Sequence, residues 1–265
     1  MADLEMTISD GIATMTMNRP DARNALSMEM RSEMDRMFHV AEFDDAVRCI
    51  VLEGAGDHFM AGGDVKAMHE YLGSHDAAET QAYFLHRIHN LHTIMFSMRR
   101  MPKPIVAKVR GAAAGAGVSI AAACDLVIAE ESSFFTLAYC HIGTTPDGSA
   151  SFHLPRTIGI KRSLEMTLLG DRYTAQQMSD MGLVNFVVAD ADLDAETDKL
   201  MARLASGPTH VYGMGKKLMY QSLENQFESQ LQLEAECFAD CAKRNDYREG
   251  VAAFMEKRKA NFTGT

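Results

Sequence analysis

The sequence has no long hydrophobic run: none reaches the roughly 18 consecutive apolar residues that suggest a membrane-spanning helix. Its first five residues lack the basic start and the apolar stretch of a secretory signal. Apolar residues nevertheless make up 47% of the 265 residues, enough for a substantial core within one large domain. We therefore expect a cytoplasmic globular protein without a membrane partner.

Cysteine patterns and nucleotide-binding motifs are also missing. The five cysteines are an odd number at irregular spacing, and none forms a CxxC pair. A disulfide framework and a structural zinc site are therefore not expected. No GxGxxG is placed for a dinucleotide and no GxxxxGK[ST] occurs, so a Rossmann or P-loop interpretation is weak.

Basic residues are fewer than acidic residues. The 26 Lys and Arg residues stand against 36 Asp and Glu residues, which gives a formal net charge of −10. This balance disfavours general nucleic-acid binding, which requires a basic face. An anionic ligand would have to be received by local basic residues against the overall field.

The hydrophobic pattern predicts strands that alternate with helices. Residues 6–17 alternate in the manner of two short strands joined by a turn at Asp10-Gly11, and Ser27 is a plausible cap for the helix that follows. Strand after helix at this spacing indicates βαβ crossovers and thus an α/β fold. Helices are expected at residues 25–43, 77–100, 118–123, 163–169, 175–181, 215–245 and 247–260, and further strands at 49–52, 105–109, 126–129, 134–137 and 184–188.

Two glycine-rich segments each follow an expected strand and precede an expected helix. They are residues 59–65 (Phe-Met-Ala-Gly-Gly-Asp-Val) and 111–117 (Gly-Ala-Ala-Ala-Gly-Ala-Gly). Backbone N–H groups at the start of a helix have no upstream partner, and small residues let a ligand approach them. Two such segments side by side could aim one N–H group each at a single oxygen, as in an oxyanion hole. Either segment alone would be interpreted as a tight turn.

Together with four further motifs in the same order, these segments resemble the crotonase superfamily of enoyl-CoA hydratases and isomerases. The resemblance is closest to the single-aspartate enoyl-CoA isomerases of the phenylacetate-degradation type. It implies a spiral of repeated ββα units over residues 1–193 and a C-terminal helical trimerisation region over residues 194–265. The further motifs are Asn18-Arg19-Pro20 with residues 22–26, residues 123–125 (Ala-Cys-Asp), residues 154–156 (Leu-Pro-Arg) and residues 249–262.

The resemblance also implies a function. A CoA thioester is held as an enolate, and the oxyanion donors match the backbone N–H groups of Gly63 and Ala116. Coenzyme A is then part of the substrate, and no separate cofactor or metal is expected. Ala61 and Asp64 flank the glycines and are candidates for substrate binding, although Asp64 is first a candidate cap for the next helix.

The acid–base residues distinguish between the reactions of this family. A hydratase usually shares the work between two glutamates. Their positions fall on Ser119 and Tyr139, and neither side chain readily replaces a carboxylate as a base near neutral pH. Both are candidates for substrate contact, and Tyr139 would line the acyl pocket or donate a hydrogen bond. An isomerase is therefore favoured over a hydratase.

A carboxylate appears eight residues after Tyr139, in Thr145-Pro146-Asp147-Gly148. In the isomerases that the chain resembles, and as a nucleophile in chlorobenzoyl-CoA dehalogenases, the same position carries an acid. Pro-Asp-Gly is also a favoured turn. With the flanking motifs we predict that Asp147 is the single proton shuttle of an isomerase. The alternatives are a hydratase, a hydrolase or dehalogenase with Asp147 as nucleophile, and a non-catalytic CoA-binding protein.

Several basic residues are candidates for the CoA phosphates. Arg23 and Lys66 lie beside the motifs, and the resemblance places Phe254 and Lys257 against the nucleotide, often of a neighbouring subunit. A solvated helix end would have the same composition. The expected partners are an acyl-CoA and further copies of the chain, as a homotrimer or a hexamer built as a dimer of trimers.

Overall fold

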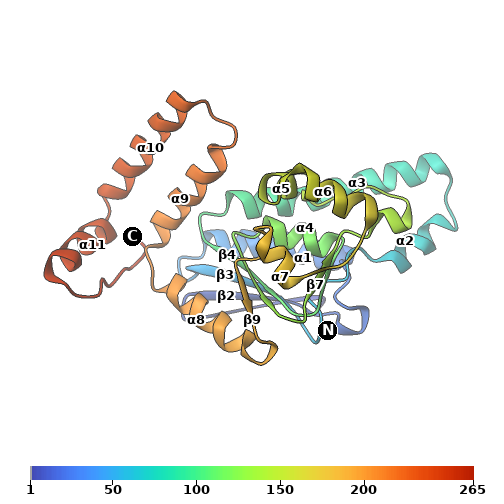
Figure 1. Ribbon diagram of the computed structural model, residues 1–265, viewed down its shortest axis with the longest axis horizontal. Helices are drawn as coiled ribbons and strands as arrows, with labels where there is room; N and C mark the ends of the chain where they lie inside the picture. The colour runs from blue at the N-terminus through green and yellow to red at the C-terminus, as the bar shows by residue number, and fades with distance from the viewer. Residues whose placement is uncertain (1) are drawn as a thin grey trace.

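The computed structural model describes residues 2–265, and its main sheet has six strands in the order β1-β2-β3-β4-β6-β9 (Figure 1). The pair β1 and β2 is antiparallel, and every later neighbour is parallel. Parallel strands end at one edge, so the segments that follow β3 and β4 begin side by side. The strands are β1 (Leu4–Ser9), β2 (Ile12–Met17), β3 (Cys49–Gly54), β4 (Ile105–Val109), β6 (Leu126–Glu130) and β9 (Phe186–Val188).

The predicted N-terminal hairpin is confirmed. Ser9 pairs with Ile12, so the turn between β1 and β2 has two residues. Asp10 and Gly11 both take left-handed backbone angles, with φ of 51° and 81°. Two consecutive positive φ values are typical of the turn that matches the twist of a hairpin, and Asp-Gly adopts it readily.

A second, smaller sheet has the order β5-β7-β8 and corrects one expectation. Its strands are β5 (Ala112–Ala114), β7 (Phe134–Thr136) and β8 (Tyr173–Thr174). Residues 111–117 were expected only to connect a strand to a helix, but their centre is β5, and Ala116 already begins the helix. The run of small residues hid this strand, because it lacks the β-branched side chains that favour strands.

Within residues 2–265, seven α-helices precede β9, the last strand of the main sheet. Ser27 caps the first of them, as predicted, and its hydroxyl accepts a hydrogen bond from the Met30 N–H at 2.9 Å. The helix over residues 77–100 is confirmed, whereas α5, which contains Pro155, was not among the expected helices. The helices are α1 (Met28–Phe43), α2 (Val65–Leu72), α3 (Ala77–Arg100), α4 (Ala116–Ala123), α5 (Ala150–Thr157), α6 (Gly159–Leu169) and α7 (Ala175–Asp180).

The main sheet buries both of its faces. Along β3, Ile50 and Leu52 belong to the large core on the side of α1, α3 and α4. Cys49 and Val51 alternate with them and belong to a smaller cluster on the other side. That cluster is closed by α8 (Leu193–Ala205), which contributes Met201 and lies across the sheet (Figure 1). A strand buried on both faces reads as a continuous apolar run, as observed here.

The last three helices project from the core. They are α9 (Thr209–Gln221), α10 (Phe227–Ala242) and α11 (Asn245–Glu256), and we call them the C-terminal arm. The expectation of one helix over residues 215–245 was wrong, because the chain turns at residues 222–226. Asn225 donates to Gln230, which in turn donates to the Leu218 carbonyl and ties α9 to α10. The division of the chain at residues 193 and 194 stays a prediction.

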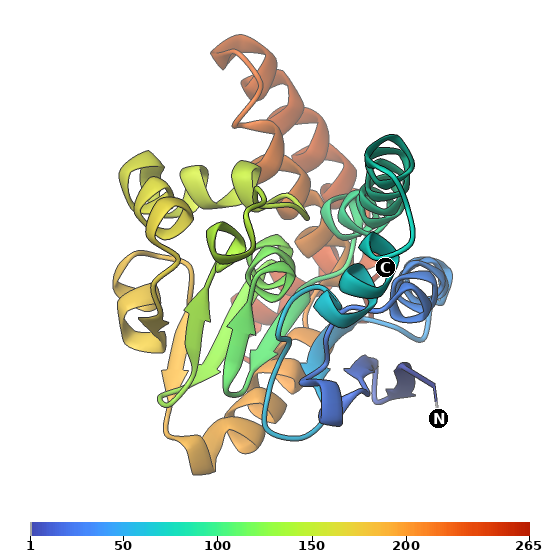
Figure 2. The same ribbon diagram turned by 90° about the vertical axis from the view of Figure 1, so that its right-hand side faces the viewer.

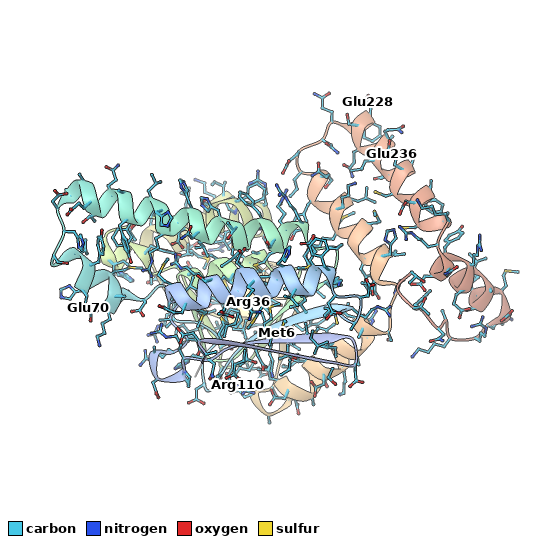
Figure 3. All side chains as sticks on the ribbon, turned by 180° about the vertical axis from the view of Figure 1, so that it is seen from behind. Met6, Arg36, Glu70, Arg110, Glu228 and Glu236 are labelled. Carbon is cyan, nitrogen blue, oxygen red and sulfur yellow. The ribbon has the colours of Figure 1, made fainter. Side chains whose placement is uncertain are left out.

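The C-terminal arm and α2 lie at opposite ends of the molecule. Figure 3 shows α10, with Glu228 and Glu236, rising on one side, while Glu70 on α2 lies at the opposite end. None of the helices described over residues 2–265 combines the length and apolarity needed to cross a lipid bilayer.

Candidate active site

The two glycine-rich segments lie against each other. The Met60 N–H donates to the Ala112 carbonyl at 3.0 Å, and the Met60 carbonyl accepts from the Ala114 N–H at 2.8 Å. A methyl group added at Gly117 would stand 2.5 Å from the Met60 carbonyl oxygen. Only glycine fits at that position, since the neighbouring atom is backbone and cannot move alone. The segment after β3 is thus held beside β5 by an isolated parallel bridge between Met60 and Ala113.

The predicted oxyanion donors, Gly63 and Ala116, stand where these segments meet. Among the hydrogen bonds of residues 2–265, neither N–H group donates to a protein acceptor. Gly62 and Gly115 bring the segments close, because a methyl group on Gly62 would lie 3.6 Å from the Gly115 Cα. Both glycines have positive φ, 102° and 51°, which favours glycine. Two free N–H groups on touching segments can receive a ligand oxygen, and their convergence on one atom stays a prediction.

Ala116 also opens α4, a helix that is buried along its whole length. The first N–H groups of a helix carry the positive end of its dipole. A negative charge that develops on an oxygen beside Ala116 would therefore be stabilised by the helix as well as by the hydrogen bond.

The three candidate residues of the acid–base region come together. The Tyr139 hydroxyl donates to Oδ1 of Asp147 at 2.5 Å, and the Ser119 hydroxyl donates to the Asp147 backbone carbonyl at 2.9 Å. Ser119 is fully buried on α4, while Tyr139 begins the 3-10 helix η2 (Tyr139–Ile142). Gly148 packs close to Ser119, so the turn of Asp147 lies directly on α4. Asp147 is thus bound to the site and does not sit on a free surface turn.

The pKa of Tyr139 is raised well above its ordinary value, first by burial and then by the charge and the hydrogen bond of Asp147. Tyr139 is therefore protonated at neutral pH and acts as a donor. Its hydroxyl donates a hydrogen bond to one carboxylate oxygen of Asp147, Oδ1. Among the described residues, no hydrogen bond reaches the second oxygen, Oδ2. That oxygen is available to take a proton.

Asp64 is the predicted helix cap. Its carboxylate accepts from the Ala67 N–H at 3.1 Å and pairs with the Arg19 guanidinium at 3.1 Å. Burial opposes the charge of Asp64, but these two contacts and the more distant Arg87 lower its pKa. The carboxylate is committed to the helix and to Arg19, which leaves Asp147 as the carboxylate that can do acid–base chemistry at this site.

Asn24 has a larger role than the sequence indicated. It is fully buried in the left-handed region, and its side-chain amide donates to the Ala55 and His58 carbonyls at 2.9 and 2.7 Å. The Arg23 carbonyl next to it accepts from the Ala61 N–H at 2.9 Å. Arg23 and Asn24, which follow the Asn18-Arg19-Pro20 motif, therefore fasten the start of the first glycine-rich segment. The positive φ of Asn24 is typical of asparagine, and its side-chain oxygen accepts from the nearby Arg19 N–H, but the two carbonyls that its amide binds are more than 30 residues away.

The CoA-binding candidates fall into two groups. Arg23 and Lys66 are exposed near the first glycine-rich segment. Phe254 and Lys257 are also exposed, but they belong to α11 and its end, at the far end of the molecule from α2 (Figures 1 and 3). Phe254 lines a cavity of about 350 Å³ between α9 and α11. Within one chain the structure does not bring Phe254 and Lys257 to Gly63 and Asp147.

The histidines near the site in sequence have other partners. His141 contacts the Gly170 carbonyl at 3.2 Å. His153 lines a separate cavity of about 180 Å³ with Asp125 and Tyr220. No cluster of three or more His, Cys, Asp or Glu side chains that could hold a metal ion occurs within residues 2–265.

Known proteins resemble this chain over nearly its full length. The family model "Enoyl-CoA hydratase/isomerase" matches residues 7–265. A Rhodobacter capsulatus protein named a probable enoyl-CoA hydratase is 36% identical, covering 97% of this chain and 96% of its own. The 1,2-epoxyphenylacetyl-CoA isomerase of Escherichia coli is 34% identical, covering 97% of each chain. The crystal structure of an enoyl-CoA hydratase from Polaromonas sp. JS666 superposes with a TM-score of 0.91 at 32% identity, over 98% and 99% of the two chains.

Proposed function

Because the chain belongs to the enoyl-CoA hydratase/isomerase family, we propose that it is an enoyl-CoA isomerase that moves a double bond with Asp147 as its single proton shuttle. One observation carries the proposal: Tyr139 donates to Oδ1 of Asp147 at 2.5 Å while Ser119 holds the backbone of the same residue. Both positions at which a hydratase would have its glutamates thus support one aspartate.

The chemistry follows from the two halves of the site. The thioester oxygen accepts hydrogen bonds from the Gly63 and Ala116 N–H groups. Oδ2 of Asp147 removes a proton from one carbon, and the electron pair of the broken C–H bond passes through the conjugated system to the thioester oxygen. The carboxylic acid so formed returns the proton two carbons along, which shifts the double bond and regenerates the carboxylate. Each oxyanion donor is typically worth about 3 kcal/mol of barrier.

Hydration would require more of this site. A water must be activated on one carbon while its neighbour is protonated, and two carboxylates usually share that work. Ser119 is committed to the Asp147 carbonyl, and Tyr139 is a protonated donor. Isomerisation, in which Asp147 returns the proton to the same substrate molecule, needs only one carboxylate, whereas addition of water usually needs two.

The test uses octenoyl-CoA and a ring-bearing acyl-CoA in deuterated buffer. We expect solvent deuterium to enter the acyl group and the double bond to move, with both processes abolished in Asp147→Asn while CoA affinity is kept. Asp198→Asn, an exposed position on α8, is the matched control and should behave as wild type. Unchanged turnover in Asp147→Asn would show that the base lies elsewhere.

The same experiment separates the alternatives by their products. A hydroxyacyl-CoA would indicate a hydratase. An acyl-aspartyl adduct at Asp147, found by mass spectrometry, would indicate a hydrolase or dehalogenase. CoA binding without exchange would indicate a non-catalytic protein. Each of these outcomes would reject the isomerase.

The proposed CoA site and the oligomer belong together. Since Phe254 and Lys257 lie far from Gly63 in one chain, they would reach a nucleotide only from a neighbouring subunit. The C-terminal arm has the exposed apolar surface for such an assembly, including Phe227, Phe238 and Phe254, which are 72%, 66% and 83% exposed. We expect a homotrimer or a dimer of trimers, which light scattering can measure, and no cofactor other than the CoA of the substrate.

A further inference from the structure

The side chain of Arg19 reaches from the Asn18-Arg19-Pro20 motif to the first glycine-rich segment. Its Nη1 and Nη2 both donate to Oδ2 of Asp64 at 3.1 Å, and Asp64 directly follows the predicted oxyanion donor Gly63. Figure 2 shows the N-terminal strands and α2 on the same side of the molecule, and Arg19 joins the end of β2 to the start of α2 there. The proton shuttle does not use this arginine, so its contacts need another explanation.

A second contact of Arg19 leads through the backbone to Gly63. Nη1 also donates to the Ala25 carbonyl at 2.6 Å, the short length of a charge-assisted hydrogen bond. The Ala25 carbonyl and the Leu26 N–H belong to one peptide unit, and that N–H donates to the Gly62 carbonyl at 2.8 Å. The Gly62 carbonyl and the Gly63 N–H belong to the next peptide unit in this series. The guanidinium is therefore connected to the predicted oxyanion donor through two peptide units.

The direction of each N–H group follows from the contact of its own carbonyl. A trans peptide unit is planar, and its C=O and N–H bonds point in opposite directions. Both units of the series are trans. The bond from Arg19 to the Ala25 carbonyl therefore directs the Leu26 N–H, and the bond from Leu26 to the Gly62 carbonyl directs the Gly63 N–H. Hydrogen bonds in such a series also polarise one another, which strengthens the last donor.

The Gly63 donor depends on this outside support more than the Ala116 donor does. Gly62 and Gly63 flank the peptide unit, and glycine restricts the backbone least of all residues. The Ala116 N–H, in contrast, is directed by its own helix, because the Gly115 carbonyl accepts from the Val118 N–H at 3.0 Å at the start of α4. The first donor therefore has to be held by contacts from elsewhere in the chain.

The charge of Arg19 is balanced, so its role does not rest on an excess of positive charge. Its Nε lies 3.5 Å from Oδ2 of Asp3, and Asp64 pairs with the other edge of the guanidinium. Asp64 is itself held by the Ala67 N–H at 3.1 Å. Two carboxylates thus hold a planar, rigid group in one orientation, in which Nη1 meets the Ala25 carbonyl. What the arginine supplies to the site is a direction.

Resting on the oxyanion hole of the proposed function, we propose that Arg19 is a positioning residue that aims the Gly63 N–H at the thioester oxygen. It acts through Leu26 and Gly62 and touches no reacting atom. A donor to the enolate oxygen contributes more in the transition state than in the bound substrate, so a misdirected donor should lower kcat more than it raises KM. An arginine that only stabilised the fold would leave the carbonyl of a bound thioester unchanged.

The test follows the thioester carbonyl of hexanoyl-CoA, labelled there with carbon-13, by NMR. We expect its resonance to move downfield on binding to wild type, because hydrogen bonds to the oxygen withdraw electron density from the carbon. Arg19→Met should lose most of this shift, and Arg19→Lys, which keeps one donor but not the fork, should lose part of it. Arg36→Met is the matched control, since Arg36 lies exposed on α1 and pairs with Glu33, and it should keep the whole shift.

Turnover of octenoyl-CoA is the second measurement on the same variants. In Arg19→Met we expect kcat to fall by about 10- to 100-fold and KM to change by less than about threefold, as for a catalytic group displaced by a small distance. Arg19→Lys should have an intermediate kcat, and this variant decides the matter if Arg19→Met does not fold.

Hexanoyl-CoA is saturated and has no double bond to move, so its carbonyl shift does not depend on whether the chain is an isomerase. A shift equal to that of wild type in either folded Arg19 variant would overturn the inference, and so would an equal loss in Arg36→Met. A wild type that leaves the resonance unmoved would reject the oxyanion hole together with the inference. The expected series of shifts without migration of the octenoyl-CoA double bond would reject only the isomerase.

Discussion

Replacing Tyr139 by phenylalanine removes one hydroxyl and keeps the ring, so it isolates the contact on which the proposed mechanism depends. The hydroxyl donates to Oδ1 of Asp147 at 2.5 Å, a length typical of a strong bond to a charged oxygen. Bonds to charged groups contribute about 1.5–3 kcal/mol. If that energy orients the base in the transition state, its loss slows the reaction by about 10- to 100-fold.

The effect should appear in kcat and not in KM. Tyr139 contacts Asp147 and Ser119, and the exposed basic candidates for the CoA phosphates are other residues. Ser119 still donates to the Asp147 carbonyl in the Tyr139→Phe variant, so the backbone of the turn should remain in place. The carboxylate alone becomes free to rotate, and a rotated carboxylate no longer presents Oδ2 to the substrate.

The assay is the steady-state migration of the octenoyl-CoA double bond, followed by the absorbance of the conjugated thioester. Tyr247→Phe, an exposed tyrosine on α11, is the matched control and should leave kcat unchanged. A kcat for Tyr139→Phe equal to that of wild type would refute the idea that this hydrogen bond positions the base. A rise in KM with unchanged kcat would place Tyr139 in substrate binding instead.

Two further predictions concern the framework of the site. Gly117→Ala puts a methyl group 2.5 Å from the Met60 carbonyl, so it should lower the free energy of unfolding by about 1–3 kcal/mol and also lower kcat. Gly215→Ala, with open space around it, is the control and should be neutral or stabilising. Denaturant titrations measure both variants. Burial, Arg99 and Arg156 lower the pKa of His153 from 6.5 to about 4. As the pH drops, the imidazole of His153 therefore binds a proton in the unfolded chain before it does so in the folded chain. The free energy of unfolding should fall by about 3 kcal/mol between pH about 6.5 and about 4. His153→Gln should flatten this part of the stability–pH curve, and an unchanged curve would contradict the assignment.

Local patterns were sufficient for much of the fold. Asp10-Gly11 indicated the hairpin and Ser27 the start of α1, because a turn and a cap each depend on a few neighbouring residues. The break between α9 and α10 left no such mark. Residues 222–226 contain neither proline nor glycine, and the turn is held by Asn225 and Gln230. A continuous amphipathic pattern therefore looked like one helix.

For the candidate site, the sequence identified the residues but not their contacts. Tyr139 and Asp147 are eight residues apart, and the resemblance was enough to name both. That Tyr139 donates to Asp147, and that Ser119 donates to the same residue from 28 positions away, depends on how η2 packs on α4. Neither spacing nor residue type determines such a contact. The structure therefore supplies the hydrogen bonds, while the sequence supplied the candidates.

The burial of Arg31 and Arg87 is the feature that the sequence pattern predicts least well. An arginine on an amphipathic helix is normally solvated, so nothing in the sequence predicts that Arg31 and Arg87 would be only 2% and 1% exposed. A net charge of −10 describes the surface field of the chain, but the charge that a bound acyl group meets is set by a few residues in a medium of low dielectric. Near the candidate site the guanidinium groups of Arg19, Arg31 and Arg87 stand against the carboxylates of Asp3, Asp64 and Asp147, so the local charge is close to zero although the whole chain is acidic.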